Sequence, residues 1–339
     1  MMGRLGAALA LAMLATGASA ETRLLDWADL DGWDADDHEA ARADFLETCR
    51  DLTEGDWPAV CAFATKAGDA RAFFETFFRP VLVTDSGEPL FTGYYEPELQ
   101  GSLVKAGPFR YPLYRRPEDA PNGTPWLTRE EIETSGALED RGLEIAWLSD
   151  PVDKFFLQVQ GSGRINLADG GSLRVGYGGK NGHPYRSVGK ELVRRGVFDA
   201  HQVSAQTIRR WVSRNPVRGP ELLWHNRSYV FFREVSQVPV SKGPLGAMNR
   251  SVTAGRTLAV DPEFVPLGAP VWLEKDGDKP LRRLMVAQDT GSAIKGAQRG
   301  DIFFGSGKGA GKIAGRTRDS GRMVMLLPIE DALLLAGGE

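Results

Sequence analysis

Hydrophobic and polar positions first divide the chain into a helical stretch and a strand-rich one. From Glu21 to about Pro80, "DHEAARADFLETCRDL" and "DARAFFETFF" carry apolar residues at three- and four-residue spacing, which predicts helices. After Pro80, "PVLVTDSGEPLFTGYYEPEL" predicts a hairpin in which 81–83 and 91–95 flank the turn "DSGEP". Gly93, between aromatic residues, predicts a point where a backbone or a ligand approaches closely.

The stretch from about 100 to 235 has a mixed pattern. "LTREEIETSGAL" and "SAQTIRRWVSRN" predict short helices, the first with a threonine cap, and "SYVFFREV" predicts a strand. "IAWLSDPVDKFFLQVQGSGRINLADGG" predicts strand, turn, strand and glycine-rich loop, which puts Gln158 and Gln160 on a strand.

The end of the chain, 236–339, is rich in short strands. "RTLAVDP", "APVWLE", "RRLMVAQD", "GDIFFG" and "GRMVMLLP" are separated by glycine and proline turns. Strands this short and irregularly spaced predict a small closed barrel more than a sandwich.

The first residues predict export. Arg4 begins a positive segment, "LGAALALAMLATG" is apolar, and 18–20 form a small-residue cleavage site, so 1–20 is interpreted as a signal peptide. The alternative is a buried N-terminal helix. Because no cysteine follows the apolar run, we expect a periplasmic protein without a lipid anchor, in which contact with the outer membrane is a secondary expectation.

Composition narrows the classes of partner. Hydrophobic residues make up 42% and charged residues 25%, as in soluble globular proteins. The net charge of −4 offers no basic excess for nucleic acid. The two cysteines, Cys49 and Cys61, predict a structural disulfide between two helical segments, the alternative being two unrelated buried thiols.

Two glycine-rich segments carry candidate ligand-binding side chains. "GSGRINLADGG" and "GYGGKNG" fit neither a P-loop nor a dinucleotide motif. Their amides, hydroxyls and aromatic rings suit a glycan. Alternatively, the two glutamines lie on the solvated face of a strand. The polar and aromatic residues in and beside these segments are Gln158, Gln160, Ser162, Arg164, Asn166, Tyr177, Asn181 and Tyr185.

Carboxylates remain the best catalytic candidates. The histidines lack zinc-ligand spacing and no G-x-S-x-G motif occurs, so we expect neither metal nor serine chemistry, and no cofactor. Asp261, Asp289 and Asp301 each lie at the end of a predicted strand, where a barrel can bring them to one rim. A partly desolvated carboxyl near other carboxylates can donate a proton to a glycosidic oxygen. The alternative for each aspartate is a turn residue.

Seven segments together resemble the membrane-bound lytic murein transglycosylase A (MltA) family. They include "FTGYYEPEL", "FFLQVQGSGRI", "VGYGGKNGHPYRSVG" and "VAQDTGSAIKGAQRGDIFFGSG", and run from about 80 to 328. The C-terminal part resembles the 3D domain, named for three aspartates that match Asp261, Asp289 and Asp301. Because members named as membrane-bound carry a lipobox cysteine, Ala20–Glu21 departs from the family pattern.

The resemblance implies a mainly β fold. It comprises a double-psi β-barrel from 21–100 and 236–339, which includes the helical segment, and a smaller inserted β-domain at 101–235. A glycan strand would lie in the groove between them. Thr92, Tyr94 and Tyr95 match residues of that groove.

The activity that the resemblance implies is a carbon–oxygen lyase reaction. A lytic exotransglycosylase cleaves the β-1,4 bond between N-acetylmuramic acid and N-acetylglucosamine without water and leaves a 1,6-anhydro end. The residues themselves do not distinguish cleavage at chain ends from cleavage within the strand. Asp301 would be the single acid and base, Asp289 would support it through hydrogen bonding, and Asp261 would be structural.

Two alternatives to this activity remain. One is a non-catalytic peptidoglycan-binding module; the other is a β-1,4-glycan hydrolase that uses Glu96 or Asp150 as a second carboxylate. We expect a monomer whose partner is the glycan strand, and whose protein partners would belong to cell-wall synthesis or division.

Overall fold

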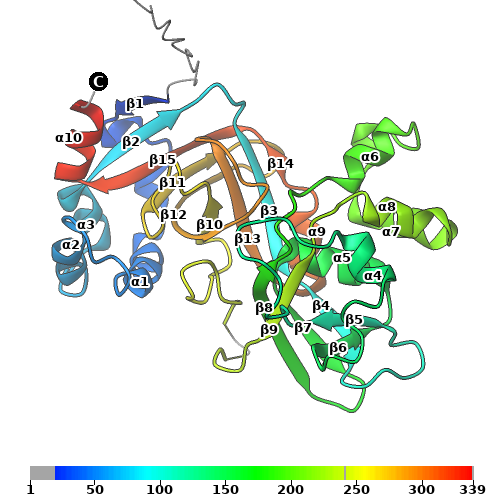
Figure 1. Ribbon diagram of the computed structural model, residues 1–339. Coiled ribbons are helices and arrows are strands. Elements are labelled where there is room, and N and C mark those ends of the chain that lie inside the picture. The colour runs from blue at the N-terminus through cyan, green and yellow to red at the C-terminus, as the bar shows by residue number, and fades with distance from the viewer. Residues whose placement is uncertain (1–19, 240–241, 338–339) are drawn as a thin grey trace, which may run out of the picture.

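Two β-sheets with flanking helices form the protein (Figure 1). The structure, a computed structural model, describes residues 20–239 and 242–337. Nearly all of the predicted signal peptide, 1–19, lies outside the described residues. Within them, no helix is long and apolar enough to cross a membrane.

The larger sheet has nine strands in mixed orientation. Its order is β1 (Glu21–Leu24), β2 (Phe78–Thr84), β15 (Gly321–Pro328), β11 (Pro270–Lys275), β12 (Leu281–Thr290), β10 (Thr257–Val260), β13 (Arg299–Ser306), β3 (Leu90–Glu96) and β14 (Arg318–Asp319). β3 pairs in parallel with β13, and β10 with β12. The C-terminal strands predicted from the sequence are all present.

The second sheet has six strands and nearly closes into a barrel. Its order is β5 (Tyr111–Tyr114), β6 (Glu144–Leu148), β4 (Glu98–Ser102), β7 (Gly163–Leu167), β8 (Ser172–Lys180) and β9 (Val230–Glu234). A bridge between Arg115, which follows β5, and Phe232 on β9 brings the two edges together.

Helices cover both sheets, so the fold is mixed α/β rather than mainly β. They are α1 (His38–Thr48), α2 (Trp57–Ala64), α3 (Ala70–Phe77), α4 (Arg129–Thr134), α5 (Pro151–Gln160), α6 (Val188–Arg194), α7 (Ala205–Arg214), α8 (Arg218–Trp224), α9 (Gly307–Ala314) and α10 (Ile329–Gly337). In Figure 1, α1–α3 and α10 lie at the end of the larger sheet, and α4–α8 lie beside the second sheet. The expected disulfide joins Cys49, at the end of α1, to Cys61 on α2.

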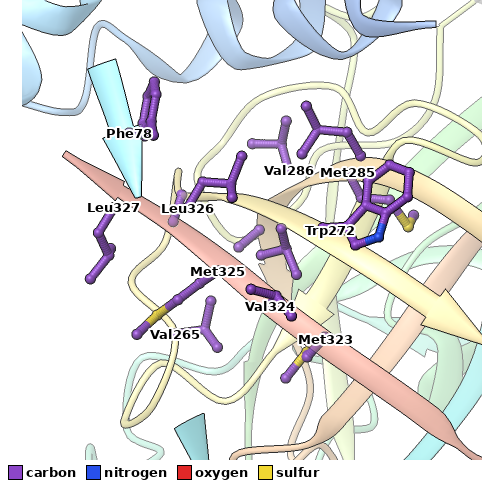
Figure 2. Close-up of a cluster of buried hydrophobic side chains, with 14 of the residues drawn as sticks. Phe78, Val265, Trp272, Met285, Val286, Met323, Val324, Met325, Leu326 and Leu327 are labelled. Carbon is purple, nitrogen blue, oxygen red and sulfur yellow. The ribbon is translucent and has the colours of Figure 1, made fainter. Parts of the chain in front are cut away.

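The main hydrophobic core lies against the larger sheet. Figure 2 shows side chains of β15, from Met323 to Leu327, projecting alternately to the two sides of the strand. Trp272 on β11 and Phe78 at the start of β2 are fully buried in the same core. Because residues on both faces of β15 are buried from Met323 onward, this part of the strand is apolar, unlike a strand with one solvated face.

The predicted hairpin of β2 and β3 was wrong. The strands exist close to their expected positions, but β2 pairs with β1 and β15, whereas β3 pairs with β13 and β14. Asp85, in the connection, accepts a hydrogen bond from the Ala297 backbone N–H at 3.0 Å, which ties the loop to the segment before β13. Non-local pairing therefore overrides the local turn signal.

The predicted strand at Gln158 and Gln160 was also wrong, because this segment is helix α5. The Asp150 carboxylate caps its first turn, accepting hydrogen bonds from two backbone N–H groups, and Pro151 occupies the first turn. Gly161 ends the helix at a φ of 78°, which favours glycine. These caps outweigh the β propensity of the aromatic and branched residues between them.

One buried ion cluster joins the two sheets where the chain passes from β3 to β4. Glu96, which is fully buried, pairs with Arg164 of β7 at 2.9 Å and with Arg174 of β8 at 2.8 Å. It also accepts a hydrogen bond from the Ser306 hydroxyl at the end of β13. Both arginines donate to the carbonyl of Lys242, which lies where the chain returns from β9 to β10. One cluster therefore contacts both segments that connect the two sheets.

We predict that Glu96→Ala lowers the free energy of unfolding by about 3–5 kcal/mol, because it leaves buried Arg174 and partly buried Arg164 without their carboxylate. Denaturant unfolding of full-length protein measures the change. Glu98→Ala, which alters an exposed residue two positions away, is the matched control. Equal losses for the two variants would contradict the assigned role of the cluster.

Candidate active site

Three strands of the larger sheet bring two of the predicted aspartates into one row. Ala259 on β10 is the register partner of Asp289 on β12 and of Asp301 on β13. Asp301 is in turn the register partner of Thr92 on β3. Residues in register lie side by side across a sheet, so the backbones of the two aspartates are two strand spacings, about 10 Å, apart.

Asp301 is held by a short polar chain. The Thr92 hydroxyl donates to Asp301 Oδ1 at 2.5 Å, and Arg299 Nη2 donates to the Thr92 oxygen at 2.9 Å. Burial raises the pKa of Asp301 to about 6, with a smaller contribution from the Asp289 charge, while Thr92 and Arg299 act in the opposite direction. The carboxyl is therefore poised to hold and release a proton near neutral pH.

Asp289 is fixed more completely than Asp301. Its Oδ2 accepts from the Tyr94 hydroxyl at 2.8 Å, and its Oδ1 accepts from the backbone N–H groups of Ala247 and Thr290 at 3.0 and 2.9 Å. Burial raises its pKa, and these three hydrogen bonds oppose the rise. With both oxygens occupied, Asp289 acts as a fixed neighbour of Asp301.

Strand β3 supplies the site through alternate residues. Thr92, Tyr94 and Glu96 lie on one face of the strand, where they contact Asp301, Asp289 and the arginine cluster. Gly93 and Tyr95 lie on the other face.

Helix α9 packs against that other face of β3. A Cβ atom on Gly93 would lie 2.5 Å from the Phe304 ring and 2.9 Å from the Ala314 backbone. The close approach predicted at Gly93 is therefore an approach of β13 and α9. Tyr95 packs against Gly311 of α9, where a Cβ atom would lie 2.8 Å from its ring. Tyr95 therefore points away from Asp301.

A cleft of about 180 Å³ opens beside Asp301. One wall comes from the larger sheet and the loop after β12; the other comes from α5, α4 and the segment before β9. Asp301 is the only carboxylate among the described residues that line it. The lining residues are Tyr94, Arg129, Gln158, Val159, Gln160, Tyr185, Asn226, Ser228, Val230, Gly291, Ser292, Ala293, Ile294, Arg299 and Asp301.

Four of the glycan-binding residues predicted from the sequence line this cleft: Tyr94, Gln158, Gln160 and Tyr185. Gln158 is buried, and its amide is engaged with Arg129 and the Val230 carbonyl. Gln160 accepts a hydrogen bond from the Tyr95 backbone N–H. Tyr185 is partly exposed in the cleft. The glutamines thus support the cleft wall.

The other predicted binding residues do not line the cleft. Asn181 is buried, and its amide bonds three backbone groups, which makes it a structural residue. Ser162 is buried beyond the end of α5, and Tyr177 is half exposed on β8. Thr92 and Tyr95 lie on β3, and of these two only Thr92 contacts Asp301.

Asp261 lies apart from the row of Asp289 and Asp301. Its two oxygens accept from the Lys295 ammonium and the Gly296 backbone N–H, both at 2.9 Å. Burial favours its protonated form, but these hydrogen bonds outweigh burial and lower the pKa of Asp261. It is an ionised residue that anchors the loop before β13.

Sequence reasoning missed Arg299, Arg129 and the loop at 291–294. Arg299 could have been found, because it lies two residues before Asp301 and therefore on the same face of the strand. Arg129 and the loop are brought to the cleft only by long-range packing. Among the described residues, no group of three histidine, cysteine, aspartate or glutamate side chains could hold a metal ion.

Comparison with known proteins agrees with this geometry. The MltA specific insert domain matches residues 90–233, and the 3D domain matches residues 256–327. The crystal structure of a membrane-bound lytic murein transglycosylase from Agrobacterium tumefaciens is 36% identical, has a TM-score of 0.81, and covers 92% of this chain and 99% of that one. The chain belongs to the MltA family.

Other members of the MltA family are similarly related. Membrane-bound lytic murein transglycosylase A of Escherichia coli (strain K12) is 38% identical over 250 residues, which are 71% of this chain and 66% of that protein. A crystal structure of E. coli MltA with bound chitohexaose is 32% identical, has a TM-score of 0.73, and covers 92% of this chain and 96% of that one.

We predict that two substitutions move the Asp301 pKa in opposite directions. Thr92→Val removes a hydrogen bond to the carboxylate and raises the pKa above that of wild type. Asp289→Asn removes a like charge and lowers it. Titration of the Asp301 carboxyl carbon by NMR measures both shifts, and shifts of the same sign would contradict the assigned geometry.

Proposed function

We propose that this protein is a lytic transglycosylase that cleaves the β-1,4 bond between N-acetylmuramic acid and N-acetylglucosamine in peptidoglycan, forming 1,6-anhydro ends. Membership of the MltA family supports the class of reaction. The single observation that carries the mechanism is that, among the described residues, Asp301 is the one carboxylate that lines the cleft, with a pKa raised to about 6. The chitohexaose bound by the E. coli relative supports a β-1,4-linked amino-sugar strand as the ligand.

The first step is protonation of the leaving oxygen. Protonated Asp301 donates its proton to the glycosidic oxygen as the bond to C1 of the muramic acid breaks. Because burial favours the neutral carboxyl, a useful fraction of Asp301 carries the proton near neutral pH. The departing sugar leaves with a free hydroxyl group at its C4.

The second step closes the anhydro ring. The C6 hydroxyl of the same muramic acid attacks C1, and the Asp301 carboxylate accepts the hydroxyl proton. The nucleophile is already tethered to the reacting carbon, an advantage worth up to roughly 7–11 kcal/mol in ideal geometry. One carboxyl therefore serves as acid and then as base, and no water is consumed.

Thr92, Arg299 and Asp289 tune the two protonation states. The Thr92 hydroxyl and the nearby Arg299 cation stabilise the Asp301 carboxylate that forms in the first step. The Asp289 charge, held by Tyr94, favours return of the proton in the second step. These opposing influences keep both forms of Asp301 accessible within one cycle.

A glycoside hydrolase would need a second carboxylate, and the described residues that line the cleft do not supply one. Inverting and retaining glycosidases use a carboxyl pair across the scissile bond. Glu96 is fully buried between two arginines, while Asp150 caps α5 and pairs with Arg209, and neither lines the cleft. A binding module has no need for an acid with a raised pKa, which argues against the non-catalytic alternative.

We also propose the finer assignments of fold and location. The parallel pairs β3–β13 and β10–β12 on either side of an antiparallel β10–β13 pair support a double-psi barrel. The six-stranded sheet is the inserted domain, which we place from Pro97 to about 235 instead of 101–235. We also propose that the protein is a monomer, that it is located in the periplasm, and that its partner is the glycan strand.

We predict that Asp301→Asn abolishes anhydro-muropeptide release from intact murein sacculi, with a loss of roughly 100- to 10,000-fold. Wild type and variant, each starting at Glu21, are incubated with sacculi, and mass spectrometry identifies the new ends. Reducing ends from the wild type would instead mean that water attacks. Equal sacculus binding without release by either protein would favour the binding module.

We further predict that wild-type kcat/KM falls as the pH rises through about 6, because the free enzyme must carry the Asp301 proton to start the reaction. Thr92→Val moves this decline to higher pH, following the raised pKa. A pH profile on soluble glycan chains measures it; a decline that does not move in Thr92→Val would exclude Asp301 as the titrating acid.

A further inference from the structure

A second and larger cavity lies in the part of the protein built on the six-stranded sheet. Its volume is about 850 Å³, compared with about 180 Å³ for the cleft at Asp301. Strands β5 and β6 and helices α4, α5, α7 and α8 contribute its walls. A hollow of this size accommodates a ligand of several residues or rings. The proposed chemistry at Asp301 makes no use of it.

The cavity and the cleft share a wall. Helix α5 lines the cavity with Lys154 and Phe155 near its middle, and the cleft with Gln158 and Gln160 at its end. Four residues of helix separate Lys154 from Gln158, a rise of about 6 Å. Buried Arg129 lines both spaces, and its guanidinium bonds Gln158 on the cleft side while lying 3.4 Å from a Glu133 oxygen on the cavity side.

Charges of both signs line the cavity in equal number. Of the residues that the structure describes, five basic and five acidic side chains contribute: Lys105, Arg110, Arg129, Lys154 and Arg209 against Glu133, Glu139, Asp140, Glu144 and Asp150. Some of these neutralise one another, as Lys154 does with Glu133 at 2.7 Å and Arg209 with Asp150 at 2.8 Å.

Other charges at the cavity have no ion-pair partner among the described residues. These are Lys105 and Arg110 of the β4–β5 connection, and Glu139, Asp140 and Glu144 near the start of β6. Aromatic surface accompanies them, with the Lys105 ammonium 5.3 Å from the centre of the Trp147 ring. The site thus offers a cation, an anion and a flat apolar face together.

We propose that this cavity binds the stem peptide carried by the muramic acid of the strand in the cleft, an inference that rests on the proposed function. A stem peptide carries free carboxylates, the amino group of its diamino acid and small apolar side chains, which match that lining. Four or five extended residues span about 14–18 Å, enough to pass from the cleft to the cavity. A phosphate-bearing ligand would require a basic excess, and a neutral glycan would not require free charges of both signs.

Binding is tested first, with a synthetic stem tetrapeptide and full-length Asp301→Asn, by isothermal titration calorimetry. Lys105→Glu and Trp147→Ala in that background weaken binding by roughly five- to tenfold, the scale of one charged or aromatic contact. Lys180→Glu, an equal reversal of an exposed lysine on β8, leaves it unchanged. Because Lys105 is exposed, its substitution keeps the test valid if Trp147→Ala does not fold.

Cleavage is tested next, with otherwise active enzyme, on glycan chains that carry stem peptides and on the same chains stripped by an amidase. The two cavity variants lower kcat/KM about five- to tenfold on peptide-bearing chains and leave it unchanged on stripped chains. Absence of tetrapeptide binding, or equal losses on both substrates, would overturn the proposal. Tetrapeptide binding without cleavage of either chain by the wild type would refute the proposed function and leave a peptide-binding cavity.

Discussion

Parallel pairing of β3 with β13 is the constraint on which the site depends. It sets Thr92 beside Asp301 and brings Glu96 opposite Ser306 at the other end of the ladder. Parallel strands need a long connection, and between β3 and β13 the chain builds the entire six-stranded sheet. A shift of one residue would turn Thr92 and Tyr94 away from the aspartates and drive Gly93 and Tyr95 off helix α9. The same register therefore determines both the contacts of the aspartates and the packing of β3 against α9.

The position of the second sheet relative to Asp301 depends on charge as much as on apolar contact. Glu96 is buried between Arg164 and Arg174, at a desolvation cost that only close pairing offsets. In return, the cluster fixes both connections between the sheets, and with them the wall of the cleft formed by α5. A purely apolar contact there would stabilise without directional hydrogen bonds to the Lys242 carbonyl. Conformational specificity is the role that the geometry supports for this cluster.

Sequence patterns predicted the elements better than their pairing. The C-terminal strands, helices α1, α3, α4 and α7, and the disulfide follow from local periodicity, caps and cysteine position. The β2–β3 hairpin failed because each strand finds its partners far along the chain. The error at α5 was avoidable, since Asp150, Pro151 and Gly161 are helix boundary signals. Asp289 and Asp301 were nominated as strand-end carboxylates, but only the pairing through Ala259 puts them in one row, and Arg129 reaches the cleft through packing that no local pattern encodes.

Asp301, the one carboxylate that lines the cleft among the described residues, is sufficient for the reaction only if the substrate supplies its own nucleophile. The source of the oxygen atom bonded to C1 therefore distinguishes attack by the sugar from attack by water, and digestion of sacculi in water enriched in oxygen-18 identifies that source directly. Mass spectrometry of the products is predicted to find no oxygen-18 at C1 of the new muramic acid ends, because the C6 oxygen closes the ring there. One oxygen-18 atom per cleaved bond at that carbon would contradict the account, since water would then be the attacking group.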